Sequence, residues 1–155
     1  LGIELLRKKI DLVWFKRDLS THDHDPLYSA SKMGPVMCLY IIEPELWKQP
    51  DLSYRHYEFL IGALKNLNEH LKTLNSSLLV KVGNSIEVFE SLAMIYQIDR
   101  VWSHQETSSL WCYNRDLSLR GWLNSQGIQW IEKPRNGVVR SLSNRDIWSK
   151  KWYVS

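Results

Sequence analysis

Short runs of apolar residues alternate along the chain with segments in which apolar residues recur every three or four positions. The runs have the length of β-strands, and their alternation with helical patterns indicates βαβ units. Such units build a parallel sheet with helices on both faces. The sequence therefore predicts an α/β fold with five strands, at Asp11–Phe15, Val36–Ile42, Leu78–Val82, Arg100–His104 and Gln129–Glu132.

The first two predicted helices carry distinct signals. Asp25 and Pro26 are typical of an N-cap and a first helical position, so a helix is expected over 26–33, with Gly34 just beyond its end. The second helix has one apolar stripe at spacings of three and four. A stripe this short favours packing against the sheet over a coiled-coil seam. The stripe consists of Tyr57, Leu60, Leu64, Leu67, Leu71 and Leu74.

Two more helices are expected after the third and fourth strands. Asn84 followed by Glu87 has the spacing of a capping box, which would satisfy the helix amides that could otherwise hold an anion. The last helix is expected over 109–125, closing at Gly127. After residue 132 the chain is basic and lacks periodicity. We expect one domain over 1–132 and a connector leaving it over 133–155.

Composition narrows the class of protein without naming it. The 155 residues suit one domain, and 44% hydrophobic and 24% charged residues are ordinary for a soluble protein. The sequence has no apolar run of about 18 residues, which is the length that would predict a membrane span. Residues 1–9 lack the apolar core of a signal peptide. Cys38 and Cys112 fit neither a disulfide framework nor a metal knuckle, which favours a reducing, cytoplasmic location. The net charge of +3 permits contact with nucleic acid but does not argue for it.

The polar residues at the ends of the first and fourth predicted strands mark the candidate site. With a strand order of 3-2-1-4-5, ligands are expected where the order reverses, between the first and fourth strands. Solvated loops and local ion pairs are the alternative explanation for these polar strand ends. Glu43, which leaves the second strand with Pro44, is expected to form a third wall. The predicted crevice is lined by Phe15, Arg17, Asp18, His104, Gln105 and Glu106.

Other groups of residues are weaker indications of a functional site. The segment 22–25 reads His-Asp-His-Asp, but Asp25 is assigned to the helix cap and no third ligand set accompanies it, so we expect no metal. The nucleophile-elbow, Walker and dinucleotide-binding glycine patterns are all missing, which argues against a serine hydrolase, an ATPase and an NAD enzyme. Basic and aromatic residues mix in 135–153. A linker, or packing on a following domain, is favoured there over nucleic-acid binding.

Four segments, in order along nearly the whole chain, resemble the DNA photolyase/cryptochrome family. The segment 13–27 contains WFKRDLS and HD, similar to the family's WFRRDLR and HD. Residues 39–44, LYIIEP, resemble the second strand and its exit. The segment 102–107, WSHQET, is similar to the HQETG that follows the fourth strand in some members. Residues 132–140, with NRD at 144–146 and Trp148, complete the resemblance.

The resemblance implies a Rossmann-like domain that holds a light-harvesting chromophore: a folate, a deazaflavin or a flavin such as FMN. A helical domain, not in this chain, would carry FAD and most of the DNA-lesion pocket, and residues 133–155 would begin the linker to it. Reduced, light-excited FAD would then split pyrimidine dimers. The crevice residues above, with Glu43, would be cofactor-binding residues.

The resemblance also implies that this chain holds no catalytic residue and would not repair DNA by itself. A cryptochrome-like signalling protein is one alternative. The others are a stand-alone nucleotide-binding domain and an interaction module.

Overall fold

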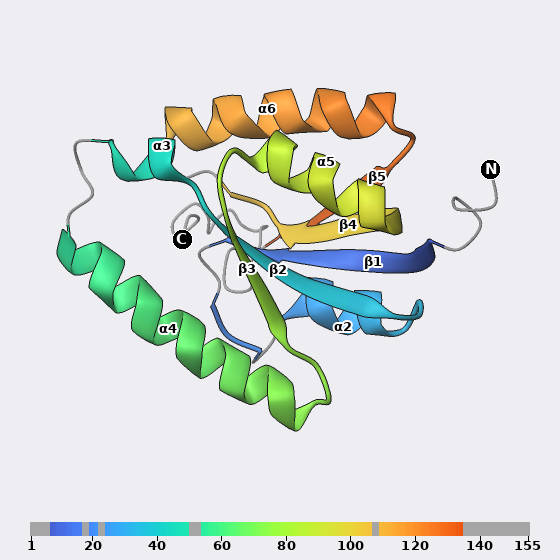
Figure 1. The fold of residues 1–155 in the computed structure, drawn as a ribbon, viewed down its shortest axis with the longest axis horizontal. Helices are drawn as coiled ribbons and strands as arrows, with labels where there is room; N and C mark the ends of the chain where they lie inside the picture. Colours follow the sequence, from blue (N-terminus) through green and yellow to red (C-terminus); the bar gives the residue numbers. More distant parts are fainter. Residues whose placement is uncertain (1–6, 17–18, 22–23, 50–53, 107–108, 135–155) are drawn as a thin grey trace, which may run out of the picture.

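The computed structural model describes residues 7–16, 19–21, 24–49, 54–106 and 109–134 (Figure 1). Five strands form one sheet, and every neighbouring pair runs parallel. The order is β3-β2-β1-β4-β5, which confirms the predicted fold class and strand order. The strands are β1 (Lys8–Phe15), β2 (Val36–Ile42), β3 (Leu78–Val82), β4 (Tyr96–His104) and β5 (Gln129–Lys133).

Helices cover both faces of this sheet (Figure 1). Residues of α4 pack with odd-numbered residues of β1 on one face, and residues of α5 and α6 pack with even-numbered residues of β1 on the other. The short α3 was not predicted, because four residues carry no periodicity. The helices are α2 (Asp25–Ser31), α3 (Pro44–Trp47), α4 (Tyr54–Thr73), α5 (Ser85–Ile95) and α6 (Leu110–Ser125).

The central strand β1 is covered on both faces. Leu12 and Trp14 enter the core beneath α5 and α6, whereas Val13 and Phe15 enter the core beneath α4. All four side chains are at most 1% exposed. A strand at the centre of a parallel sheet is buried on both faces, and its sequence is therefore a continuous apolar run. β1 and β4 also begin earlier than predicted, since Lys8 pairs with Tyr96 and a register shift follows Ile10.

The start of α2 differs from the prediction. His24, not Asp25, is the N-cap, and its Nδ1 accepts a hydrogen bond from the Leu27 amide at 3.1 Å. A neutral imidazole nitrogen can accept this bond as a carboxylate oxygen would. Asp25 is the first helical residue, where its charge suits the helix dipole and its Oδ1 accepts from Ser29 Oγ at 2.7 Å. The helix ends at Ser31, two residues before the predicted end.

The other helix signals agree closely with the structure. Leu60, Leu64, Leu67 and Leu71 form the buried stripe of α4, whereas Tyr57 and Leu74 at the stripe's ends are 37% and 59% exposed. Asn84 caps α5 by accepting from the amides of Ile86 and Glu87. Gly127 follows α6 with a φ of +72°, the left-handed conformation that glycine adopts without strain.

Among the described helices, none is long and apolar enough to cross a bilayer. Cys38 in β2 and Cys112 in α6 are both buried, and they form no disulfide with each other. Burial raises the pKa of the Cys38 thiol to about 11, which keeps it protonated and unreactive at neutral pH.

The cap of α5 offers a test of the local fold. We expect Asn84→Ala to lower the free energy of unfolding by about 1 kcal/mol, because two helix amides lose their acceptor. Asn66→Ala, at an exposed position inside α4, is the matched control and should change stability by less than about 0.5 kcal/mol. Urea denaturation measures both, and equal stabilities would contradict the assigned cap.

Candidate functional site

A cavity of about 350 Å³ lies at the carboxyl ends of β1 and β2, between α3, the first half of α4, and α6. Its volume is at the lower end of the range for small-molecule sites, about 300 to 1,000 Å³. Trp14, Phe15, Tyr40, Trp47 and Phe59 give it aromatic walls. Lys16, Glu43, Glu106 and Arg115 supply its ionisable groups near the strand ends. The cavity thus lies at the carboxyl edge of the sheet, as predicted for a ligand, but over β1 and β2, with Glu106 as its contribution from the exit of β4.

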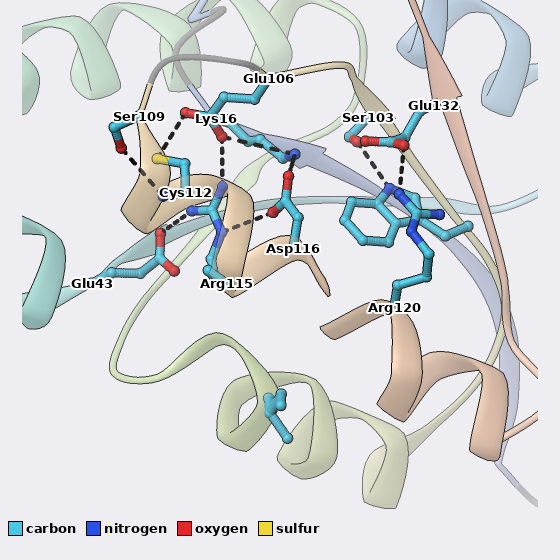
Figure 2. Close-up of polar contacts among 12 residues, drawn as sticks. Lys16, Glu43, Ser103, Glu106, Ser109, Cys112, Arg115, Asp116, Arg120 and Glu132 are labelled. Carbon is cyan, nitrogen blue, oxygen red and sulfur yellow. Dashed lines mark hydrogen bonds and ion pairs between the residues drawn. The ribbon is translucent and has the colours of Figure 1, made fainter. Parts of the chain in front are cut away.

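Arg115 of α6 is the centre of a cluster of buried charges (Figure 2). Its guanidinium donates to three carboxylates that come from different parts of the chain. The distances are 2.6 Å from Nη1 to Glu43 Oε1, 2.5 Å from Nη2 to Glu106 Oε1, and 2.9 Å from Nε to Asp116 Oδ1. The Arg115 side chain is only 7% exposed. One cation therefore links the exits of β2 and β4 to α6.

Lys16 joins the same cluster from the end of β1. Its Nζ lies 3.4 Å from Asp116 Oδ2 and 3.8 Å from Glu106 Oε1. The ammonium also lies over the Trp14 ring, 4.5 Å from its centroid, and over the Trp130 ring at 5.1 Å. Ring faces attract cations, and the attraction strengthens away from water. Lys16 is thus held between carboxylates and indole rings.

The cluster changes the protonation of Glu43. Burial raises the pKa of this carboxyl from 4.5 to about 7, although Arg115 opposes the rise. The negative charges of Glu106 and Asp116 raise it further. For Arg115, burial acts to lower the pKa, but the surrounding carboxylates outweigh burial and the pKa is raised. Arg115 is therefore always charged, whereas Glu43 changes charge near neutral pH.

Two polar atoms of the cavity wall have no hydrogen-bond partner among the described residues. They are Oε2 of Glu43 and Nε1 of Trp47, and both are buried. A buried polar group without a partner costs about 1 to 3 kcal/mol. Such groups in a native structure call for an explanation, and a bound molecule is one. These two atoms suit an aromatic ligand that carries its own hydrogen-bonding groups.

The structure brings only part of the predicted crevice into this cavity. Phe15, Glu43 and Glu106 line it. His104 is buried behind Phe15: its ring lies 4.6 Å from that of His24, which in turn lies 4.5 Å from Phe15. The amide of Gln105 donates to the Lys133 carbonyl beside β5, and its side chain is exposed. Arg17 and Asp18 lie outside the described residues, as do His22 and Asp23 of the weighed metal cluster.

Sequence reasoning missed Trp47 and the α6 residues Arg115 and Asp116. A signal for Asp116 was available, because Cys112, Asp116, Leu119 and Leu123 form the buried face of α6. A charged residue on an apolar stripe requires a buried partner. For Arg115 there was no such signal, since its partner Glu43 is 72 residues away.

Two other hollows are larger. One of about 810 Å³ lies between α2 and the end of α4, and one of about 560 Å³ lies between α3, the start of α5, and α6. The first has a single carboxylate, Asp25, in its wall. In the second, the start of α5 is already capped by Asn84. Glu43 and Arg115 border the second hollow as well, so the aromatic walls, together with Lys16 and Glu106, favour the smaller cavity as the functional site.

The described residues thus form a doubly wound parallel sheet with a cavity at the carboxyl ends of its strands, the edge where α/β domains of this class bind cofactors and nucleotides. A comparison with protein families identifies the family: residues 11–144 match the DNA photolyase family. The chain belongs to this family.

Curated relatives are cryptochromes. A cryptochrome DASH of Gloeobacter violaceus is 34% identical over 107 residues, which are 65% of this chain and 21% of that protein. A cryptochrome DASH of Synechocystis is 30% identical over 103 residues, 63% of this chain and 21% of that protein. The chain thus spans about a fifth of the length of these relatives.

Solved structures share the fold. A Synechocystis cryptochrome superposes with a TM-score of 0.72 and 26% identity, over 81% of this chain and 27% of that one. An archaeal photolyase from Sulfolobus tokodaii, whose structure contains two FAD molecules, gives a TM-score of 0.75 and 22% identity, over 85% of this chain and 30% of that one. The described residues have the fold of the N-terminal domains of these proteins.

Replacing Arg115 tests the cluster. We expect Arg115→Met to lower the free energy of unfolding by about 3 to 5 kcal/mol, because three buried carboxylates lose their shared cation. Arg120→Met is the control, since the partly exposed ion pair of Arg120 with Glu132 is separate from the cluster in Figure 2 and should contribute at most about 1 kcal/mol. Urea denaturation at neutral pH compares them; similar losses would show that the cluster has no special role.

The raised pKa of Glu43 gives a pH dependence. The folded state keeps this proton up to about pH 7, whereas the unfolded chain loses it near 4.5. The resulting stabilisation is complete below the unfolded pKa and is lost as the pH rises through the folded one. We expect the wild type to lose stability relative to Glu43→Gln between about pH 5 and 8. Glu45→Gln, at an exposed position, should show no such slope. A pH-independent difference for Glu43→Gln would contradict the raised pKa.

Proposed function

We propose that this chain is the light-harvesting domain of a photolyase-like flavoprotein and that the 350 Å³ cavity binds its antenna chromophore. The observation that carries the proposal is the cavity itself: it lies at the carboxyl ends of β1 and β2, has aromatic walls, and two of its lining residues have a buried polar atom without a partner among the described residues. Planar aromatic molecules with polar ring atoms fit such walls. A folate, a deazaflavin and a flavin such as FMN are the candidates.

Within this proposal, each side chain has a defined task. Phe15 and Trp47 provide flat apolar surface, while Glu43 and Glu106 provide acceptors. His104 and His24 support Phe15 from behind, and Gln105 holds the β4 exit against β5. Arg17 and Asp18 follow β1 in the sequence and are proposed to contact the same ligand. When bound, the chromophore absorbs near-ultraviolet or blue light and passes the excitation on.

The remaining tasks belong to a longer protein. We propose that residues 133–155 begin a linker to a helical domain that binds FAD, and that this protein acts on pyrimidine dimers in DNA. A light-signalling cryptochrome would use the same antenna domain, and curated relatives of this chain are cryptochromes. The described part contributes light capture in either case, with the electron transfer occurring at FAD.

A spectral titration tests the proposal. The purified chain is mixed in turn with reduced folate, a 5-deazaflavin, FMN and FAD, and absorption and tryptophan fluorescence are recorded. We expect one of them to bind and to quench Trp14 and Trp47, which line the cavity. Glu106→Gln should weaken binding about tenfold, equivalent to about 1.4 kcal/mol.

Glu132→Gln is the matched control, because Glu132 pairs with Arg120 and does not line the cavity. Circular dichroism verifies that both variants fold. If none of the four chromophores binds the folded chain, the domain is a scaffold and the proposal is wrong.

A further inference from the structure

Glu43 and Trp47 mark the two ends of α3 and lie four residues apart. Residues at this spacing lie on the same face of a helix, and both line the cavity. Glu43 is the N-cap residue of α3, but its side chain makes no capping bond. Its Oε1 accepts from Arg115, which leaves Oε2 buried and without a partner in the described structure. The carboxylate is thus fixed through one oxygen and available through the other.

Trp47 is fixed in a similar way. Its ring meets the Tyr57 ring edge-on, with a centroid separation of 5.6 Å and an interplanar angle of 89°, a geometry usual for aromatic pairs. The pair joins α3 to α4 across the wall of the cavity. The indole Nε1 is buried without an acceptor. An indole N–H can only donate, and an ionised carboxylate can only accept.

These two groups require opposite partners in the ligand. Oε2 of Glu43 needs a donor, and Nε1 of Trp47 needs an acceptor. A ring lactam, in which an N–H is bonded directly to a C=O, supplies both on one edge of a flat molecule. Flavins, deazaflavins and pterins all have such an edge, whereas a plain hydrocarbon ring does not.

The charges around the cavity argue for an uncharged edge. Arg115 already donates to three carboxylates, and Lys16 lies between two of them. These five groups carry two positive and three negative formal charges. A phosphate or a carboxylate tail placed among them would add to an excess of negative charge. When Glu43 is ionised, an uncharged ring edge therefore fits this end of the cavity better than a charged tail.

We propose that Glu43 and Trp47 are a recognition pair for the lactam edge of the ligand, with Glu43 accepting from the ring N–H and Trp47 donating to the ring C=O. This assignment rests on the proposed function and adds the chemical group that the cavity selects. The specificity comes from unpaired atoms: a ligand without the N–H leaves Glu43 unsatisfied, and a ligand without the C=O leaves Trp47 unsatisfied.

Lumiflavin and 3-methyllumiflavin are the probes, because they differ only in a methyl group that replaces the lactam hydrogen and neither has a phosphate tail. Dissociation constants are measured by fluorescence with the 155-residue chain at fixed ionic strength. We expect the methyl group to weaken binding at least about tenfold. Trp47→Phe, which keeps a ring and removes the N–H, should weaken lumiflavin about 5- to 30-fold. Trp122→Phe removes an indole N–H of α6 that does not line the cavity, and should change nothing.

The pH dependence of lumiflavin affinity is a further measurement, and it would not change if Glu43 had a purely structural role. The carboxylate form of Glu43 accepts the ring N–H, so lumiflavin binding should tighten as the pH rises through about 7. In Glu43→Gln the pH dependence should disappear and the penalty for the methyl group should shrink. Glu45→Gln, at an exposed position of α3, should keep both effects. The ionisable groups that face Glu43 or share its cavity are Lys16, His56, Glu106, Arg115 and Asp116, and Glu45 and Glu87 line the neighbouring hollow that Glu43 also borders.

The outcomes separate this inference from the proposed function. Equal affinities for the two lumiflavins, with no effect of Trp47→Phe, would overturn the lactam assignment and leave a chromophore site. Binding of a folate or FMN without any binding of lumiflavin would do the same, because the ring alone would not be recognised. If neither lumiflavin nor any of the four chromophores binds the folded chain, the proposed function and the lactam assignment are both wrong.

Discussion

The contact of Arg115 with Glu43, Glu106 and Asp116 is the interaction on which the candidate site depends. A buried guanidinium is stable only when most of its donors are paired, and here three carboxylates pair with it. Two of these carboxylates follow β2 and β4, and Lys16 follows β1. Arg115 thereby links the exits of β2 and β4 to α6, and Lys16 joins the exit of β1 to them through Glu106 and Asp116. The carboxyl edge of the sheet becomes a defined wall instead of a set of independent loops.

The same contact decides which atoms remain for a ligand. Arg115 occupies Oε1 of Glu43, a residue of the cavity wall, and Oε2 has no partner among the described residues. Burial raises the pKa of Glu43 to about 7, with a smaller contribution from the negative charges of Glu106 and Asp116, although Arg115 opposes the rise. The feature that stabilises the strand exits thus also places a group that titrates near neutral pH beside the cavity. Perturbed groups in a cleft are typical of functional sites.

The sheet and its order were predictable because the signals are local. Apolar runs fix the strands to within a few residues, and the alternation with helices fixes the parallel arrangement. The switch-point rule predicted a ligand at this edge of the sheet from topology, and of the residues named for it Phe15, Glu43 and Glu106 line the cavity there. His24 was missed as a cap because a histidine nitrogen is a rarer acceptor than the neighbouring Asp25 carboxylate. Asp116 showed a partial signal on the buried face of α6, but the pairing of Arg115 with Glu43 spans 72 residues and has no local pattern.

A light-harvesting site imposes a demand that a simple binding site does not, because energy transfer requires a chromophore of fixed orientation. Rigid elements hold a ligand more precisely than loops do. In this chain the proposed contacts come from the end of β1, from α3 and from α6, and buried ion pairs and edge-on rings lock these elements together. A lactam edge held by Glu43 and Trp47 would set the ring's rotation within its own plane, while the aromatic walls would set the plane itself. Orientation would then follow from the fold, with no need for the ligand to order a loop.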